Sequence, residues 1–210
     1  MDLNLPKIYP ITNSEVSGLS HTEQVRRLIA GGATFIQLRE KQKAAGDWFP
    51  DALEAARLCR EAGVTCIVND RVDIALTIDA DGVHLGQDDM PVAYARRLLG
   101  RGKIIGLSTH SIEQLEAALR EPVDYLAIGP IFDTSTKSDP DPAIGIEMLS
   151  KAAQTSGMMP LVAIGGIKAD NLSSIISAGA ASAAIIGALL ADPDRISERF
   201  HEYSQIASQC

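Results

Sequence analysis

The chain has 210 residues, of which 46% are hydrophobic and 22% charged, and this composition predicts one folded domain over residues 1–210 rather than a disordered chain. Its formal net charge of -8 excludes a general nucleic-acid-binding protein, which needs many cations to neutralise phosphates, but it leaves room for a small phosphorylated ligand. Only 4% of the residues are aromatic, which predicts a core of Ala, Val, Ile and Leu.

Short β-branched runs alternate along the chain with longer helical patterns. Several runs, such as Leu161–Ile164, are apolar on both faces, as are the strands of a parallel sheet that helices cover on both sides. The predicted strands are Ile8–Thr12, Thr34–Arg39, Thr65–Asn69, Gly82–Leu85, Lys103–Ser108, Tyr125–Gly129, Leu161–Ile164 and Ala183–Ile186.

Helix start and stop signals lie between these strands. The Ser-x-x-Glu motif at 20–23 and the Ser-x-x-Gln motif at 111–114 predict capping boxes, and Pro91 predicts the start of a further helix. The last helix is predicted from about Asp192 to Ser208. Left-handed glycine caps are predicted at Gly31, Gly63, Gly100 and Gly179.

Eight strands alternating with eight helices predict an α/β fold, a single-domain (β/α)8 TIM barrel slightly smaller than the typical barrel of about 250 residues. An open doubly wound sheet is the main alternative, but no G-x-G-x-x-G motif follows the first strand. Barrel enzymes carry their functional groups at the carboxyl ends of many strands. The long loop Ile131–Ala143 is rich in Asp, Ser, Thr and Pro, and its length in so compact a chain indicates a functional loop.

Charged residues gather where the second, third and fourth strands end. Alternation places Gln37, Arg39 and Lys41 on one side of the second strand, either as converging cations or as a solvated strand end. The third and fourth strands are neighbours in a barrel, so Asp70 and Asp89 are expected to approach one another. Two such carboxylates suit Mg²⁺, whereas the alternative is that each of them caps the helix that follows.

Polar groups also follow the later strands. The Ser108 hydroxyl either binds a ligand oxygen or caps a helix, and the run Thr134–Lys137 forms either a phosphate cradle or a solvated loop. Gly166 and Gly187 allow backbone amides to approach an anion, at strand ends where phosphate sites recur in barrels, although each is equally compatible with a simple turn.

No convincing nucleophile accompanies these groups. His84 lies within the fourth strand and is predicted to be a hydrogen-bonded polar residue inside the barrel. Neither His110 nor Asp124 has a geometric reason to join Ser108 in a triad, and no persuasive Ser/His or Cys/His pair is visible.

Features of the chain as a whole predict a cytoplasmic protein. Cys59, Cys66 and Cys210 form no C-x-x-C pair, which predicts reduced thiols. The first residues show no signal-peptide pattern, and no apolar run approaches the roughly 20 residues needed to span a membrane. We therefore expect small-molecule partners rather than a nucleic acid or a membrane.

Six motifs occur in order over nearly the whole chain. They are Q-L-R-E-K at 37–41, N-D-R at 69–71, G-V-H-L-G-Q-D-D at 82–89, G-L-S-T-H at 106–110, G-P-I-F-D-T-S-T-K at 129–137 and A-I-G-G-I at 163–167. Together they resemble the thiamine phosphate synthase family. The resemblance implies a TIM-barrel transferase that joins hydroxymethylpyrimidine diphosphate to a thiazole phosphate and releases thiamine phosphate and pyrophosphate.

The resemblance also implies a role for individual residues. Asp70 and Asp89 would bind Mg²⁺, the implied cofactor. The substrate-binding residues would be Gln37, Arg39, Lys41, Asn69, Ser108, Thr134, Thr136, Lys137, Gly166, Ile186 and Gly187, of which Arg39, Lys41, Ser108 and Lys137 would be catalytic. At two positions the chain departs from the family: Asn13 replaces a more common aspartate, and Gly187 replaces a usual serine, so that a hydroxyl contact to the thiazole phosphate is lost.

Two other functions fit the same barrel. A thiazole tautomerase-like isomerase would share the thiazole site but would not need paired carboxylates. A non-catalytic sensor of a phosphorylated ligand would need no cationic pyrophosphate site. The presence of both Asp70 and Asp89, together with the full set of cations, favours the transferase.

Overall fold

The strands close into a barrel, which confirms the predicted fold and excludes the open doubly wound sheet. The computed structural model describes residues 3–134 and 142–210. Each strand pairs in parallel with the next, and β1 pairs with β8. The strands are β1 (Ile8–Thr12), β2 (Phe35–Leu38), β3 (Thr65–Asn69), β4 (Gly82–Leu85), β5 (Ile104–Thr109), β6 (Tyr125–Ile128), β7 (Leu161–Ile164) and β8 (Ser182–Ile185).

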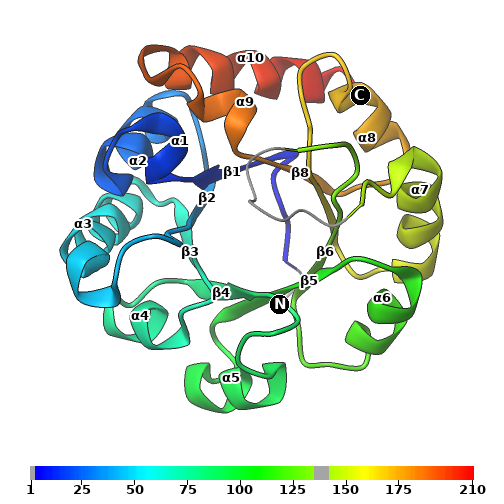
Figure 1. Cartoon of the computed structure of the whole chain (residues 1–210), viewed down its shortest axis with the longest axis horizontal. Helices are drawn as coiled ribbons and strands as arrows, with labels where there is room; N and C mark the ends of the chain where they lie inside the picture. Colours follow the sequence, from blue (N-terminus) through cyan, green and yellow to red (C-terminus); the bar gives the residue numbers. More distant parts are fainter. Residues whose placement is uncertain (1–2, 135–141) are drawn as a thin grey trace.

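A ring of helices surrounds the barrel (Figure 1). They are α1 (Ser14–Ser17), α2 (His21–Ala30), α3 (Ala45–Ala62), α4 (Val72–Thr77), α5 (Val92–Leu99), α6 (Ile112–Ala118), α7 (Gly145–Ser156), α8 (Leu172–Ser177), α9 (Gly187–Leu190) and α10 (Ile196–Ser208). Within the described ranges, the short helices α1 and α9 add to the eight that the sequence predicts. The last predicted helix begins instead as a 3-10 turn, η1 (Pro193–Arg195), ahead of α10. None of the described helices is long and apolar enough to cross a membrane.

The serine half of each predicted capping box is confirmed. Ser20 Oγ accepts from the Glu23 amide at 3.1 Å, and Ser111 Oγ accepts from the Gln114 amide at 3.2 Å. The second half differs, because Gln114 Oε1 accepts from the His110 amide and the Glu23 carboxylate pairs with arginines of its own helix. At each of these two helix starts, the serine side chain makes the predicted capping contact and the reciprocal contact from the third helical residue is not formed.

Three of the four predicted glycine caps have positive φ angles: Gly63 (67°), Gly100 (75°) and Gly179 (100°). The prediction is wrong for Gly31, whose φ is -78°, and the left-handed position falls on Gly32. Glycine is required at position 31 for a steric reason, because a Cβ there would lie 2.7 Å from the Ser197 carbonyl oxygen. Glycine at this position lets α10 pack closely against the end of α2.

Two hydrophobic layers stabilise the barrel. The layer between strands and helices consists largely of Ala, Val, Ile and Leu, as predicted. The interior of the barrel does not follow that prediction, because Tyr9, Phe35 and Tyr125 fill it together with aliphatic side chains. The rings of Tyr9 and Phe35 meet edge to face at 4.7 Å. These three of the nine aromatic residues of the chain lie inside the barrel, whereas others, such as Trp48, pack in the outer layer.

Candidate active site

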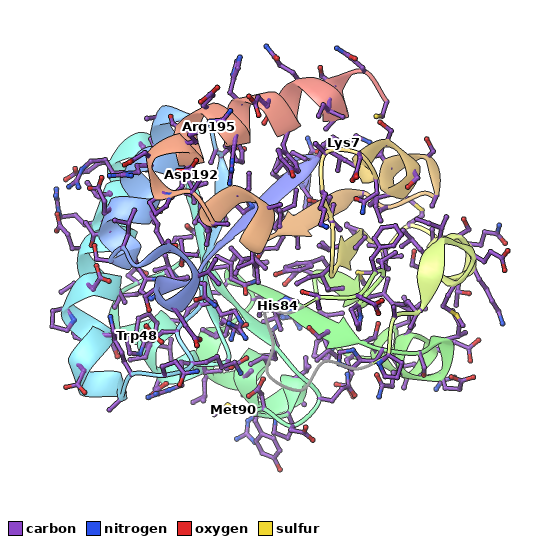
Figure 2. The ribbon with its side chains drawn as sticks, turned by 45° about the horizontal axis from the view of Figure 1, so that its top comes forward. Lys7, Trp48, His84, Met90, Asp192 and Arg195 are labelled. Atoms are coloured by element: carbon purple, nitrogen blue, oxygen red, sulfur yellow. The ribbon has the colours of Figure 1, made fainter. Side chains whose placement is uncertain are left out.

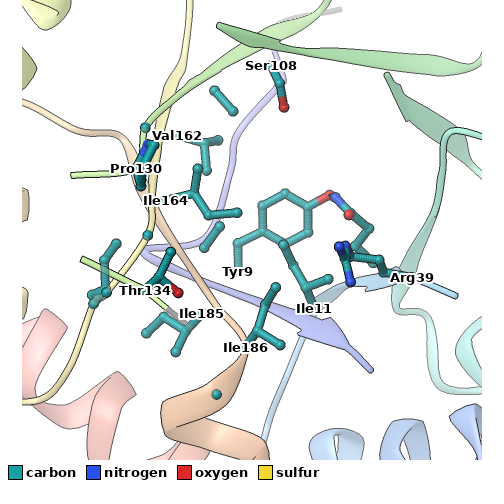
Figure 3. Close-up of a pocket in the computed structure, with 18 of the residues that line it drawn as sticks. Tyr9, Ile11, Arg39, Ser108, Pro130, Thr134, Val162, Ile164, Ile185 and Ile186 are labelled. Carbon is teal, nitrogen blue, oxygen red and sulfur yellow. The ribbon is translucent and has the colours of Figure 1, made fainter. Parts of the chain in front are cut away.

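A cavity of about 1390 Å³ opens at the carboxyl ends of the strands. Figure 3 shows Arg39 and Ser108 around the Tyr9 hydroxyl, and Thr134 on the opposite side with Ile185 and Ile186. The predicted residues that line it are Gln37, Arg39, Lys41, Asn69, Asp70, Asp89, Ser108, Thr134, Gly166, Ile186 and Gly187. Thr136 and Lys137 lie outside the described residues. Sequence positions at the ends of seven strands, β2 to β8, are therefore brought into one pocket.

The end of β2 supplies two of the cations that line this pocket, Arg39 and Lys41. Gln37 is buried, whereas Arg39 is partly buried and Lys41 is exposed. Burial lowers the pKa of the Arg39 guanidinium, which has no carboxylate within salt-bridge distance in the described part of the chain. A desolvated cation without a protein counter-ion favours binding of an anion.

Glu40, which the sequence analysis did not single out, fixes the turn that follows Arg39. Its side chain is only 2% exposed. The carboxylate accepts from Ser14 Oγ at 2.6 Å and from the amides of Lys41 and Gln42 at 2.9 and 2.8 Å. Burial alone would raise the pKa of Glu40, but hydrogen bonds from Ser14, Gln42, His21 and Lys43 outweigh it and lower the pKa from 4.5 to about 2. Glu40 thus holds the backbone that carries Lys41.

This carboxylate should make stability depend on acid pH. A pKa lowered from 4.5 to about 2 means that the stabilisation is complete above the unfolded value and is lost as the pH falls towards the folded value. We expect Glu40→Gln to be less stable than the parent at about pH 6, with the difference in unfolding free energy shrinking between about pH 4.5 and 2. Urea unfolding of both proteins over this range measures it. A pH-independent difference would contradict this assignment.

Asp70 and Asp89 face one another across the ends of β3 and β4, as predicted. Burial is the largest cause that raises the pKa of Asp70, and the nearby Asp89 raises it further. The Lys41 ammonium pairs with Asp70 and opposes this rise. The capping alternative fails for both residues, because neither α4 nor α5 has a side-chain cap and Asp89 instead accepts from the Gly86 amide at 2.6 Å. Asp70 also adopts a positive φ of 59°.

Asp70 and Asp89 offer carboxylate oxygens, the ligand type that Mg²⁺ prefers. In the described ranges, no cluster of three or more His, Cys, Asp or Glu side chains could hold an ion. Two neighbouring carboxylates nevertheless fit Mg²⁺, which commonly takes one or two protein carboxylates and completes its octahedral shell with water and substrate phosphates. The residues present fit an ion that is held jointly by protein and ligand.

Asn69 adds a donor to the pocket. The residue is 8% exposed, and its buried Nδ2 makes no hydrogen bond with the described residues. A buried amide donor without an acceptor costs about 1–3 kcal/mol. A ligand oxygen in the pocket would remove that cost.

Ser108 forms a pair that the sequence analysis did not foresee. Its Oγ lies 2.8 Å from His84 Nε2, which corrects the expectation that no Ser/His pair exists. His84 is buried and hydrogen-bonded inside the barrel, as predicted, and Figure 2 shows it near the middle of the molecule. Its Nδ1 contacts the Tyr125 hydroxyl at 2.8 Å instead of a carboxylate. Burial lowers the pKa of His84 to about 4. The pair therefore lacks the acid that orients a catalytic triad.

The other candidates for a triad have separate partners. His110 Nδ1 lies 2.7 Å from the Gly129 carbonyl oxygen. Asp124 accepts from Arg96 at 2.6 Å and from the Ile105 amide at 2.7 Å. The expectation that neither residue joins Ser108 is confirmed.

Two glycines after β7 let backbone line part of the pocket there, beside apolar side chains such as Ile164 and Ile185. Gly165 and Gly166 have φ angles of 103° and 63°, and a Cβ at Gly166 would lie 2.6 Å from the Asp133 carbonyl oxygen. Glycine is required here because the segment after β6 passes so closely. Ile186 and Gly187 line the same end, where the chain turns into α9.

Asn13, where the resemblance implies an aspartate, caps a helix. Its Oδ1 accepts from the Val16 amide at 3.0 Å and so caps α1, a contact that an aspartate would also make. The departure at Gly187 lies in the pocket itself.

Comparison with known proteins places this pocket in a family. A model described as thiamine monophosphate synthase matches residues 8–189. A thiamine-phosphate synthase of Chloroflexus aurantiacus is 46% identical over 90% of this chain and 87% of its own, and one of Syntrophomonas wolfei is 45% identical over 89% and 90%. A solved thiamine phosphate pyrophosphorylase of Pyrococcus furiosus superimposes with a TM-score of 0.87 at 35% identity, covering 98% of this chain and 97% of its own.

More distant structures share the fold alone. A thiamine phosphate pyrophosphorylase of Bacteroides thetaiotaomicron, at 19% identity, has a TM-score of 0.69 over 97% of this chain and 98% of its own. The matched residues of the family model run from β1 into α9 and so include every described strand end that lines the pocket. This chain belongs to the thiamine monophosphate synthase family.

Proposed function

We propose that this pocket couples hydroxymethylpyrimidine diphosphate to a thiazole phosphate, yielding thiamine phosphate and pyrophosphate. Family membership supports the transferase reaction. The observation that carries the proposal is the partly buried Arg39, which has no carboxylate partner among residues 3–134 and 142–210 and lines the same cavity as the facing carboxylates Asp70 and Asp89. A cation beside a metal-type carboxylate pair is the arrangement that a diphosphate requires.

The diphosphate would bind at the ends of β2, β3 and β5. Within the described ranges, the Arg39 guanidinium has no carboxylate partner and the buried Asn69 Nδ2 has no acceptor. Gln37 and Ser108 line the same pocket, and Lys41 brings a second cation to Asp70. These groups would donate hydrogen bonds to the diphosphate.

Mg²⁺ would be held by Asp70 and Asp89, with the remaining ligands coming from the diphosphate and water. When bound, the ion would neutralise negative charge on the leaving pyrophosphate. Burial first, and then the neighbouring Asp89, raise the pKa of Asp70, and a cation held between the two carboxylates would offset both effects. We expect EDTA to abolish coupling and added Mg²⁺ to restore it.

The chemistry requires no protein nucleophile. The bond between the pyrimidine methylene carbon and the diphosphate oxygen breaks, its electron pair leaves with pyrophosphate, and the electron-rich aminopyrimidine stabilises the cationic methylene. The thiazole nitrogen then donates its lone pair to that carbon. Arg39 would stabilise the charge that develops on the leaving group, and Ser108 would donate a hydrogen bond to it.

The thiazole phosphate would occupy the opposite side of the pocket. Thr134 and the backbone of Gly166, Ile186 and Gly187 line that side. Gly187 offers an amide but no hydroxyl. The contacts predicted from the sequence, of Thr136 with the thiazole phosphate and of Lys137 with the pyrophosphate, remain predictions.

One assay tests the function against its rivals. The protein is incubated with both precursors and Mg²⁺, and thiamine phosphate and pyrophosphate are measured by phosphorus NMR. We expect both products in equal amounts. Tautomerised thiazole phosphate without coupling would identify an isomerase instead, and binding without turnover would identify a sensor. The exposed Arg57, which pairs only with Glu54 and Glu61 on α3, gives a control variant, Arg57→Ala, that should retain activity.

We place this reaction in the cytoplasm. All three cysteines are free thiols, with Cys59 and Cys66 buried and Cys210 exposed. Free thiols are typical of a reducing compartment.

A further inference from the structure

A chain of hydrogen bonds crosses the barrel interior beneath the pocket. Gln37 Nε2 donates to the Tyr9 hydroxyl at 2.8 Å, and the Tyr9 and Tyr125 hydroxyls lie 3.0 Å apart. The Tyr125 hydroxyl lies 2.8 Å from His84 Nδ1, and His84 Nε2 lies 2.8 Å from Ser108 Oγ. The chain begins at Gln37 and ends at Ser108, and both residues line the pocket.

The first bond determines where every other hydrogen lies. Because Gln37 donates to Tyr9, the Tyr9 hydrogen is directed to its other partner, the Tyr125 oxygen. The Tyr125 hydrogen then points to His84 Nδ1, which must be unprotonated. A neutral imidazole with a bare Nδ1 carries its proton on Nε2, which donates to Ser108. The Ser108 hydrogen is consequently left for the pocket.

Burial keeps the members of this chain uncharged. It lowers the pKa of His84 to about 4, and it raises the pKa values of Tyr9 and Tyr125 above their ordinary value. Of the charged groups, Asp89 acts on His84 from a distance and opposes the lowering. The His84 and Tyr125 rings also stack at 5.4 Å. The hydrogen order is therefore not disturbed by titration near neutral pH.

We propose that Tyr9, Tyr125 and His84 are positioning residues that hold this chain in one of its two hydrogen orders, so that Ser108 presents a donor to the substrate. In the opposite order, Ser108 would donate to His84 and would turn only lone pairs towards the diphosphate. The order also leaves Gln37 with Oε1 and the second hydrogen of Nε2 uncommitted to Tyr9. The inference rests on the proposed function for the identity of the anion that receives the Ser108 hydrogen.

The hydrogen order can be read directly from the histidine ring. In protein labelled with ¹⁵N at histidine, we expect the His84 proton on Nε2, with the signal assigned by its loss in His84→Asn. Gln37→Glu places a carboxylate that can only accept a hydrogen bond from Tyr9. This substitution should reverse the direction of every hydrogen bond in the series and move the His84 proton to Nδ1. A proton on Nδ1 in the parent, or on Nε2 in folded Gln37→Glu, would overturn the proposal. This experiment needs no substrate, so its outcome is independent of the coupling assay.

Kinetics provides a second test if Gln37→Glu does not fold. Tyr125→Phe removes the central link and should lower kcat about 3- to 10-fold, the range of one neutral hydrogen bond, with an unchanged KM for the thiazole phosphate. Phe35→Leu disturbs the same interior cluster without breaking the chain, and it should lower stability but not kcat. A parent-like kcat in folded Tyr125→Phe would refute the positioning role.

Discussion

Replacing Arg39 or Asp89 by alanine should lower kcat at least about 10²-fold without unfolding the protein, since loss of one preorganised group at a developing charge costs this much. Arg39 offers the pocket a partly buried guanidinium that has no carboxylate partner in the described part of the chain. Asp89 supplies half of the carboxylate pair, and its protein contact is the Gly86 amide. Steady-state coupling rates measure the effect.

Two controls separate this loss from damage to the fold. Arg57→Ala removes an exposed arginine of α3, and Asp194→Ala removes a carboxylate whose side chain is 95% exposed. Both should keep the parent rate, and all four variants should have parent-like circular dichroism. Rates near the parent value in folded Arg39→Ala and Asp89→Ala would rule out the assignment of this pocket.

Gly106→Ala should destabilise the barrel from the inside. A Cβ at Gly106 in β5 would lie 2.1 Å from Tyr125 Cζ and 2.5 Å from His84 Nδ1. Tyr125 is fully buried and cannot move aside, so we expect a loss of about 1–3 kcal/mol or more in unfolding free energy. For a chain of this length, each kcal/mol lowers Tm by about 2–4 °C. Thermal unfolding measures it.

Gly46→Ala is the matched control for this substitution. Gly46 lies in the first turn of α3, and nothing lies within 4 Å of a Cβ built there. Alanine in a helix is favoured over glycine by roughly 0.5–1 kcal/mol, so this variant should be at least as stable as the parent. Equal Tm values for the two alanine variants would show that the barrel interior tolerates the extra methyl group.

The predicted site residues came together because of simple periodicity. In a parallel barrel all carboxyl ends meet at one rim, so residues that follow different strands, such as Arg39, Asp70 and Ser108, must converge. The eight strands and the longer helices were predictable for the same reason, since apolar runs and start or stop signals mark them, whereas the four-residue helices α1 and α9 are too short to show a periodic pattern. Errors remained at single residues such as Gly31, where packing against α10 outweighed the usual capping role.

Contacts between distant strands were not predictable. The Tyr9 and Tyr125 hydroxyls meet across 116 positions of sequence, and the stagger of a closed barrel, which no local pattern reveals, decides that meeting. Ser108 reaches His84 because His84 aligns with Gly106 in the register of β4 and β5. Alternation would place Glu40 opposite Arg39, facing away from the site. The chain instead turns after β2, and the turn closes around the Glu40 carboxylate.

The pairing of β1 with β8 has a consequence for the order in which the molecule is completed. Ile8 aligns with Ala183 and Tyr9 with Ala184, so β1, the first strand to be synthesised, cannot complete its pairing until β8, the last, is present. Until β8 emerges from the ribosome, β1 and β7 each expose a row of unpaired backbone groups that another chain can capture. Ile186 and Gly187, which follow β8, complete the pocket. Pairing of β8 therefore both covers the exposed edges of β1 and β7 and completes the pocket.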